Sequence, residues 1–116
     1  MKFLLILAAL TGAPVAAFAH AHLVTATPSA GSQVAAPAAL VISYSEALEP
    51  TLSTIEVTDA AGRRVDKADL HTTSADGKTV SVSLGTLAPG EYAVVWHATS
   101  IDTHKTEGHF SFTVVK

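Results

Sequence analysis

The chain has 116 residues, a formal net charge of −3 at pH 7 and no cysteine. Nucleic-acid binding normally needs a basic stripe. The one basic cluster here is short and of the kind found in solvated turns: it consists of Arg63, Arg64 and Lys67. The sequence therefore argues against a nucleic-acid partner. Disulfides and thiolate metal sites are excluded outright. Six histidines are many for this length, and they are His20, His22, His71, His97, His104 and His109.

Residues 1–19 have the pattern of a cleavable secretory signal. An apolar stretch from Phe3 to Leu10 follows a charged start, and Ala17-Phe18-Ala19 supplies a small-x-small cleavage site. A membrane span needs about 20 apolar residues, and Gly12 and Pro14 interrupt this segment too early. We therefore expect an exported protein with no stable membrane anchor after cleavage.

Cleavage after Ala19 would leave residues 20–116 as one small domain that begins with His20. The free α-amino group and the imidazole of a first residue can bind one metal ion together, which an internal histidine cannot do. While residues 1–19 are attached, the His20 nitrogen lies in a peptide bond. The site is then expected to be distorted or open.

Alternation of apolar and polar residues, bounded by Gly, Pro and Asp, predicts a series of short strands. They are residues 23–27, 39–45, 53–58, 78–84, 92–96 and 108–115. Residues 63–70 are expected to form a hairpin partner or an irregular edge. Pro37 favours a loop over a helix for residues 35–39.

Core positions follow from the period of two along each strand. Leu40, Ile42 and Tyr44 share one face of a strand, as do Tyr92, Val94 and Trp96, and Phe110, Phe112 and Val114. The segment from Leu87 to Tyr92 has the pattern of a tyrosine corner. Together these signals predict an all-β fold, a seven-stranded antiparallel Greek-key β-sandwich or barrel that is immunoglobulin-like and cupredoxin-like in appearance.

Asp102 and His104 lie two residues apart, so in an extended segment their side chains leave the same face. With the amine and ring of His20 they would offer three nitrogens and one oxygen. Nitrogen and oxygen donors in a tetragonal arrangement suit Cu(II). Zinc in a tetrahedral arrangement is the alternative.

Several motifs of the mature chain occur in the order and spacing of one family. They are His20-Ala21-His22-Leu23-Val24, Thr27-Pro28-Ser29-Ala30-Gly31-Ser32, Tyr44-Ser45-Glu46, Leu87 to Trp96, Ser100-Ile101-Asp102-Thr103-His104 and Phe110-Ser111-Phe112. In these motifs the chain resembles the bacterial copper-resistance CopC proteins, which are exported copper carriers.

The resemblance implies a periplasmic protein of copper homeostasis and resistance that binds one Cu(II) ion through His20, Asp102 and His104. Glu46 matches an acidic position beside that site, as a partner of the ligands or a weak ligand. The family also implies transfer of copper to a CopD-type inner-membrane importer, with no catalytic step. Some members have a methionine-rich Cu(I) site, but the only methionine here is Met1, so no such site is expected.

Alternatives remain at the level of single residues and of function. His22 is either a further ligand on the side of His20 or an exposed histidine, and His109 lies near the mouth of the site or at an exposed strand start. His71 and His97 are interpreted as ordinary loop or sheet histidines. The functional alternatives are a small secreted copper oxidase or monooxygenase with an N-terminal histidine brace, and a metal-free immunoglobulin-like interaction module.

Overall fold

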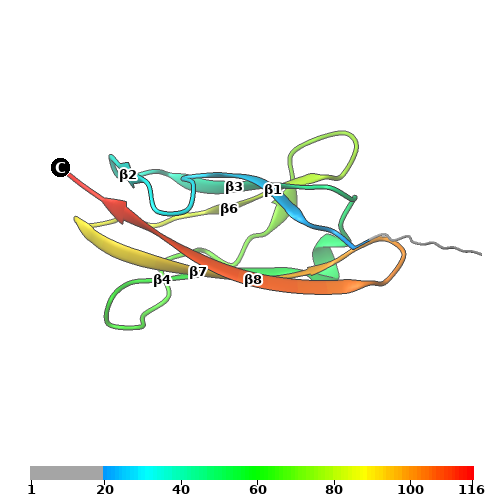
Figure 1. Ribbon diagram of the computed structural model, residues 1–116. Coiled ribbons are helices and arrows are strands. Elements are labelled where there is room, and N and C mark those ends of the chain that lie inside the picture. Colours follow the sequence, from blue (N-terminus) through cyan, green and yellow to red (C-terminus); the bar gives the residue numbers. More distant parts are fainter. Residues whose placement is uncertain (1–19) are drawn as a thin grey trace, which may run out of the picture.

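The computed structural model describes residues 20–116, which form two four-stranded sheets packed face to face (Figure 1). The strand order is β1-β3-β6-β5 in one sheet and β2-β8-β7-β4 in the other. The elements are β1 (Leu23–Thr27), β2 (Gln33–Val34), β3 (Ala39–Tyr44), the 3₁₀ helix η1 (Pro50–Leu52), β4 (Thr54–Thr58), β5 (His71–Thr72), β6 (Thr79–Ser83), β7 (Gly90–Thr99) and β8 (Lys105–Val114). Within residues 20–116 no helix has the length and apolar character needed to cross a membrane. The expected signal lies outside the described residues.

The core lies between the sheets and is filled by alternate residues of their strands. Leu40 and Ile42 of β3 are fully buried, as is Val94 of β7, and Phe112 of β8 is 1% exposed. Because side chains alternate between the two faces of a strand, this burial follows directly from the alternation in the sequence. The predicted all-β sandwich and the predicted inward faces of these strands are confirmed.

The tyrosine corner is also confirmed. The hydroxyl of Tyr92 donates a hydrogen bond of 2.6 Å to the carbonyl oxygen of Ala88, and the Tyr92 ring stacks on Phe112 with 5.7 Å between the ring centroids. Trp96 packs edge-on against Tyr44 of the opposite sheet, with ring centroids 5.3 Å apart. Burial raises the pKa of Tyr44 far above the ordinary tyrosine value. The contact between Tyr44 and Trp96 joins the two sheets, whereas Tyr92 and Phe112 are paired neighbours within one sheet.

The structure departs from the expected strand list at short elements. β2 and β5 have two residues each, too few for an alternation to be visible, so the described chain has eight strands rather than seven. β2 pairs with β8 in parallel, whereas the sequence predicted only antiparallel pairs. β8 begins at Lys105, three residues earlier than expected, because polar residues there continue the pairing with β7.

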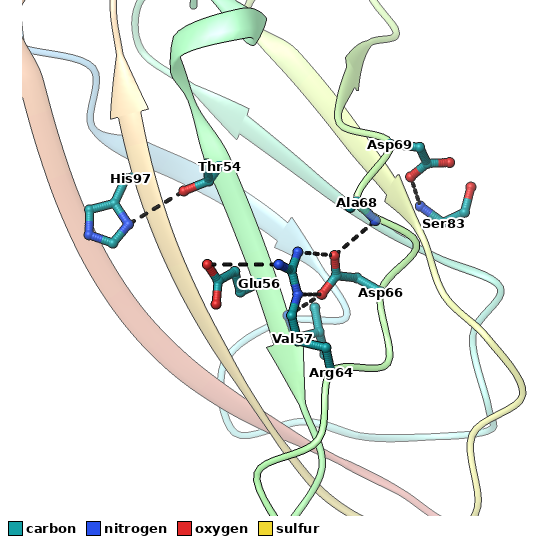
Figure 2. Close-up of polar contacts among 9 residues, drawn as sticks. All are labelled: Thr54, Glu56, Val57, Arg64, Asp66, Ala68, Asp69, Ser83 and His97. Carbon is teal, nitrogen blue, oxygen red and sulfur yellow. Dashed lines mark hydrogen bonds and ion pairs between the residues drawn. The ribbon is translucent and has the colours of Figure 1, made fainter.

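Residues 63–70 form the irregular edge that was one of the two expectations. The side chain of Asp66 is fully buried and accepts hydrogen bonds from Arg64, at 2.6 Å, and from the amide nitrogens of Val57 and Ala68, at 2.8 and 3.0 Å. Figure 2 shows this carboxylate between the loop and β4. The Asp66 carboxylate thus accepts hydrogen bonds from backbone amides that would otherwise be made to the carbonyl oxygens of a regular strand.

The start of the described chain and the connection between β7 and β8, which both carry histidines, meet at one end of the sandwich. In Figure 1 the blue start of the chain lies beside the orange connection between β7 and β8. Ser45 donates its amide hydrogen to the carbonyl oxygen of His22 at 2.8 Å, and the hydroxyl of Thr106 donates to the carbonyl oxygen of Ala21 at 2.7 Å. The segment before β1 is therefore bonded to both sheets.

Candidate metal centre

The N-terminal half of the candidate centre is held by Ser45, the residue that follows β3. Its hydroxyl accepts a hydrogen bond from the His22 amide at 2.8 Å and donates one to the His20 carbonyl oxygen at 3.2 Å. Ala21, between the two histidines, is fully buried, and both histidines are exposed. The buried alanine and the serine bridge fix the direction in which His20 leaves the sandwich.

The second half is the turn from Ser100 to His104, between β7 and β8. Ser100 is 2% exposed, and its amide donates to the His104 carbonyl oxygen at 2.9 Å. Its hydroxyl donates to a carboxylate oxygen of Asp102 and lies 3.2 Å from the His104 carbonyl oxygen. Thr103 has a φ of 74°, a left-handed conformation that is uncommon for a β-branched residue. This tight turn is anchored at its buried end and exposed at its tip.

Asp102 and His104 lie close together at that tip. His104 Nδ1 is 3.2 Å from Asp102 Oδ2, and the two side chains are 53% and 48% exposed, in the order His104 and Asp102. The hydrogen bond from the Ser100 hydroxyl and then that from His104 hold the pKa of Asp102 below its ordinary value. The carboxylate is therefore ionised and open to a cation from solvent.

The two halves meet through their imidazole rings. The His20 and His104 ring centroids are 5.1 Å apart, at an interplanar angle of 60°, and the His22 ring centroid is 6.4 Å from that of His20. The structure thus places the His20 ring beside the His104 ring, with Asp102 on His104 and with His22 at the edge. Glu46 follows the Ser45 bridge and is exposed.

Within residues 20–116, no three side chains of the His, Cys, Asp and Glu types are gathered closely enough to hold a metal ion by themselves. In the uncut chain the His20 backbone nitrogen belongs to a peptide bond, so an amine ligand does not exist there. The donor atoms at this place are nitrogen and oxygen. The His20 backbone nitrogen could join them only after cleavage turns it into a free amine.

Three hydroxyl residues that support the centre were not identified as site residues from the sequence. Ser45 bridges His20 and His22, Ser100 bonds Asp102, and Thr106 bonds the backbone of Ala21. Ser45 and Ser100 lie inside motifs that the chain shares with the CopC proteins, and this position was the one sign in the sequence that they could belong to the site. The partners of Ser45 and Thr106 are far away in the sequence, so their roles follow only from the fold.

Known proteins resemble this chain over most of its length. The sequence model of the CopC domain matches residues 23–115. Protein YobA of Escherichia coli K12 is 38% identical over 99 residues, covering 84% of this chain and 80% of the relative. Copper resistance protein C of Xanthomonas campestris pv. juglandis is 35% identical over 108 residues, covering 88% and 85%. The crystal structure of CopC from Methylosinus trichosporium OB3b superimposes with a TM-score of 0.76 at 32% identity, covering 82% of this chain and 93% of that one.

Proposed function

We propose that this chain, which belongs to the CopC domain family, is an exported copper-binding protein. It binds one Cu(II) ion in the periplasm through the amine and ring of His20, the carboxylate of Asp102 and the ring of His104. Its role is that of a carrier or buffer in copper homeostasis and resistance. No catalytic step is part of this role.

The observation that carries the proposal is the meeting of His20 with the Asp102–His104 pair. The ring centroids of the two histidines are 5.1 Å apart, and Asp102 lies 3.2 Å from His104. After cleavage the set has three nitrogen donors and one oxygen donor, which suits Cu(II) in a tetragonal arrangement. The amine must lose a proton to bind, and its ordinary pKa of about 7.7–8.0 makes this accessible near neutral pH.

His22 and Glu46 take lesser parts in the proposed centre. His22 has its backbone tied to Ser45, with its ring 6.4 Å from that of His20, so it lies at the rim. Glu46 is exposed beside the same serine. Each is proposed as a partner of the ligands or as a weak ligand.

The proposed carrier works with Cu(II) and passes it to a membrane protein. Asp102 and His104 are about half exposed, so a partner can reach the ion, and we propose a CopD-type inner-membrane importer as that partner. The only methionine is Met1, within the expected signal. A methionine-rich Cu(I) site is therefore not part of the proposal.

The aromatic residues favour a carrier over a copper oxidase or monooxygenase. Tyr44, Tyr92, Trp96 and Phe112 are at most 7% exposed, and Phe110 is partly buried against the same core. In the described part of the chain no aromatic face is therefore left open to bind a flat substrate. Peroxide consumption or substrate oxidation by the copper-loaded protein would contradict the carrier proposal.

The decisive experiment alters only the amine. The N-terminus of the exported protein is determined by mass analysis, and its Cu(II) affinity is compared with that of a version carrying one extra alanine before His20. Loss of an outer partner of a metal ligand weakens binding about 10- to 100-fold. Because the amine is proposed as a ligand itself, we expect its loss to lower the Cu(II) affinity at least about a hundredfold. The variant His71→Ala, a histidine on the exposed strand β5, serves as the control. Unchanged tight binding by the extended version would remove the amine from the centre.

A further inference from the structure

A second group of potential metal ligands lies on the outer face of β7 and β8 and is not used by the proposed centre. His97 pairs directly with Glu107 across the two strands, and Val95 pairs with His109. Trp96, next to His97 along β7, points into the core and is 7% exposed. Because neighbouring residues of a strand point to opposite faces, His97, Glu107 and His109 share the solvent side.

His97 and Glu107 are already in contact. His97 Nε2 is 3.3 Å from Glu107 Oε1, and the side chains are 55% and 75% exposed. The other ring nitrogen, Nδ1, lies 3.5 Å from the hydroxyl oxygen of Thr54 on β4, as Figure 2 shows. When Nδ1 carries the hydrogen and Thr54 accepts it, Nε2 is the bare nitrogen that can bind a metal. An oxygen acceptor behind the ring is the usual support of a metal-binding histidine.

The separation of these two donor atoms fits a chelate. An ion at about 2.0–2.1 Å from a nitrogen and an oxygen that are 3.3 Å apart subtends an angle of about 107°. This angle is close to the tetrahedral value and within reach of a distorted tetragonal one. The ring and the carboxylate would therefore need little movement to hold one ion between them.

The surroundings leave room for the ion. Val95, His97, Glu107, Gly108 and His109 line a hollow of about 240 Å³. His109, two residues beyond Glu107 on the same face, can supply a third nitrogen after a change of rotamer. Lys105, two residues before Glu107, places a positive charge on this face and weakens the attraction for a cation.

We propose that His97 and Glu107 chelate a divalent first-row transition-metal ion, with His109 as an auxiliary donor and water completing the coordination. Residues 20–116 do not gather three such side chains in advance, so this site binds more weakly than the N-terminal centre. It is separate from that centre in its ligands, and it does not depend on cleavage at Ala19. In a copper-binding protein it would act as a second, rapidly exchanging place for the ion.

The test uses the version with an extra alanine before His20, so that the amine is blocked, and Zn²⁺ as a diamagnetic probe. Ring nitrogen resonances of all histidines are followed by NMR during the titration. We expect the His97 Nε2 resonance to move most, His109 to move less, and His71 to stay unchanged. Shifts confined to His20 and His104 would instead report the N-terminal centre, so the two proposals fail separately.

Two substitutions decide the assignment. Glu107→Gln keeps the size of an exposed side chain and should weaken Zn²⁺ binding at His97 at least tenfold, and His97→Ala should abolish it. His71→Ala should have no effect. The proposal is overturned if His97 does not respond at millimolar Zn²⁺, or if Glu107→Gln binds as tightly as the unaltered chain.

Discussion

Replacement of Ser100 by alanine tests how the fold positions Asp102 in the proposed copper centre. Ser100 is 2% exposed, and its hydroxyl bonds the carboxylate of Asp102. The variant removes this one donor and adds no bulk. The carboxylate of Asp102, which is already 48% exposed, then keeps only its contacts with His104.

The expected magnitude follows from the chemistry of this contact. A hydrogen bond to a charged group contributes about 1.5–3 kcal/mol, and water can replace the serine on the exposed side of the carboxylate, which favours the lower end. Loss of an outer partner of a metal ligand weakens metal binding about 10- to 100-fold. We therefore expect Cu(II) affinity to fall about tenfold, or about 1.4 kcal/mol.

The measurement is a competition titration of the cleaved protein with a Cu(II) chelator. Circular dichroism and urea unfolding of the same samples separate a loss of affinity from a loss of fold. The matched control is Ser81→Ala, a buried serine of β6, which should leave copper affinity unchanged. An intact Ser100→Ala protein that binds Cu(II) within twofold of the unaltered chain would refute a positioning role for this hydroxyl.

Two further predictions concern the scaffold. A Cβ at Gly108 would lie 2.5 Å from Trp96 Cζ2, whereas one at Gly85 would meet nothing closer than a backbone oxygen at 3.6 Å. Gly108→Ala should therefore lower the free energy of unfolding by about 1–3 kcal/mol relative to Gly85→Ala. Equal urea midpoints for the two variants would contradict this packing. Burial by itself raises the pKa of Asp66, but hydrogen bonds from Arg64 and two backbone amides outweigh it and the pKa is lowered. Because the pKa is lower in the folded state, the ionised carboxylate stabilises the fold at pH values above the unfolded pKa of about 3.9. This stabilisation is lost as the pH falls from there through the lower pKa of the folded state. Asp66→Asn should then be less stable by about 2 kcal/mol at pH 7 and should lose less stability between pH 5 and pH 2, so parallel pH curves for the two proteins would exclude this role.

Much of the fold could be predicted because the alternation of side chains is a local property of an extended backbone. Leu40 and Ile42 were assigned to the core from their spacing alone, and both are fully buried. The Tyr92 corner was also visible as a local pattern, and its hydrogen bond to Ala88 spans four residues. The strands β2 and β5 were missed because two residues are too few to display a period.

The candidate centre was predictable in the same local sense. Asp102 and His104 are two residues apart, and their convergence needs only an extended or turning segment. The position of His20 as a first residue depends on the cleavage pattern before it. That prediction lies on residues outside the described part of the chain, and it stays a prediction.

The sequence by itself determined which side chains face inward and which residue types could bind copper, because both depend on neighbours along the chain. Only the tertiary structure decided which hydroxyls hold them and which exposed residues meet. Ser45 reaches His20 across 25 positions, and His97 meets Glu107 because the register of β7 and β8 places them opposite each other. A strand's own sequence sets its faces, whereas the partners across a sheet are set by how distant strands pair. That pairing is the physical reason why the residues that support the proposed centre, and those of the proposed second site, could be recognised only in the folded chain.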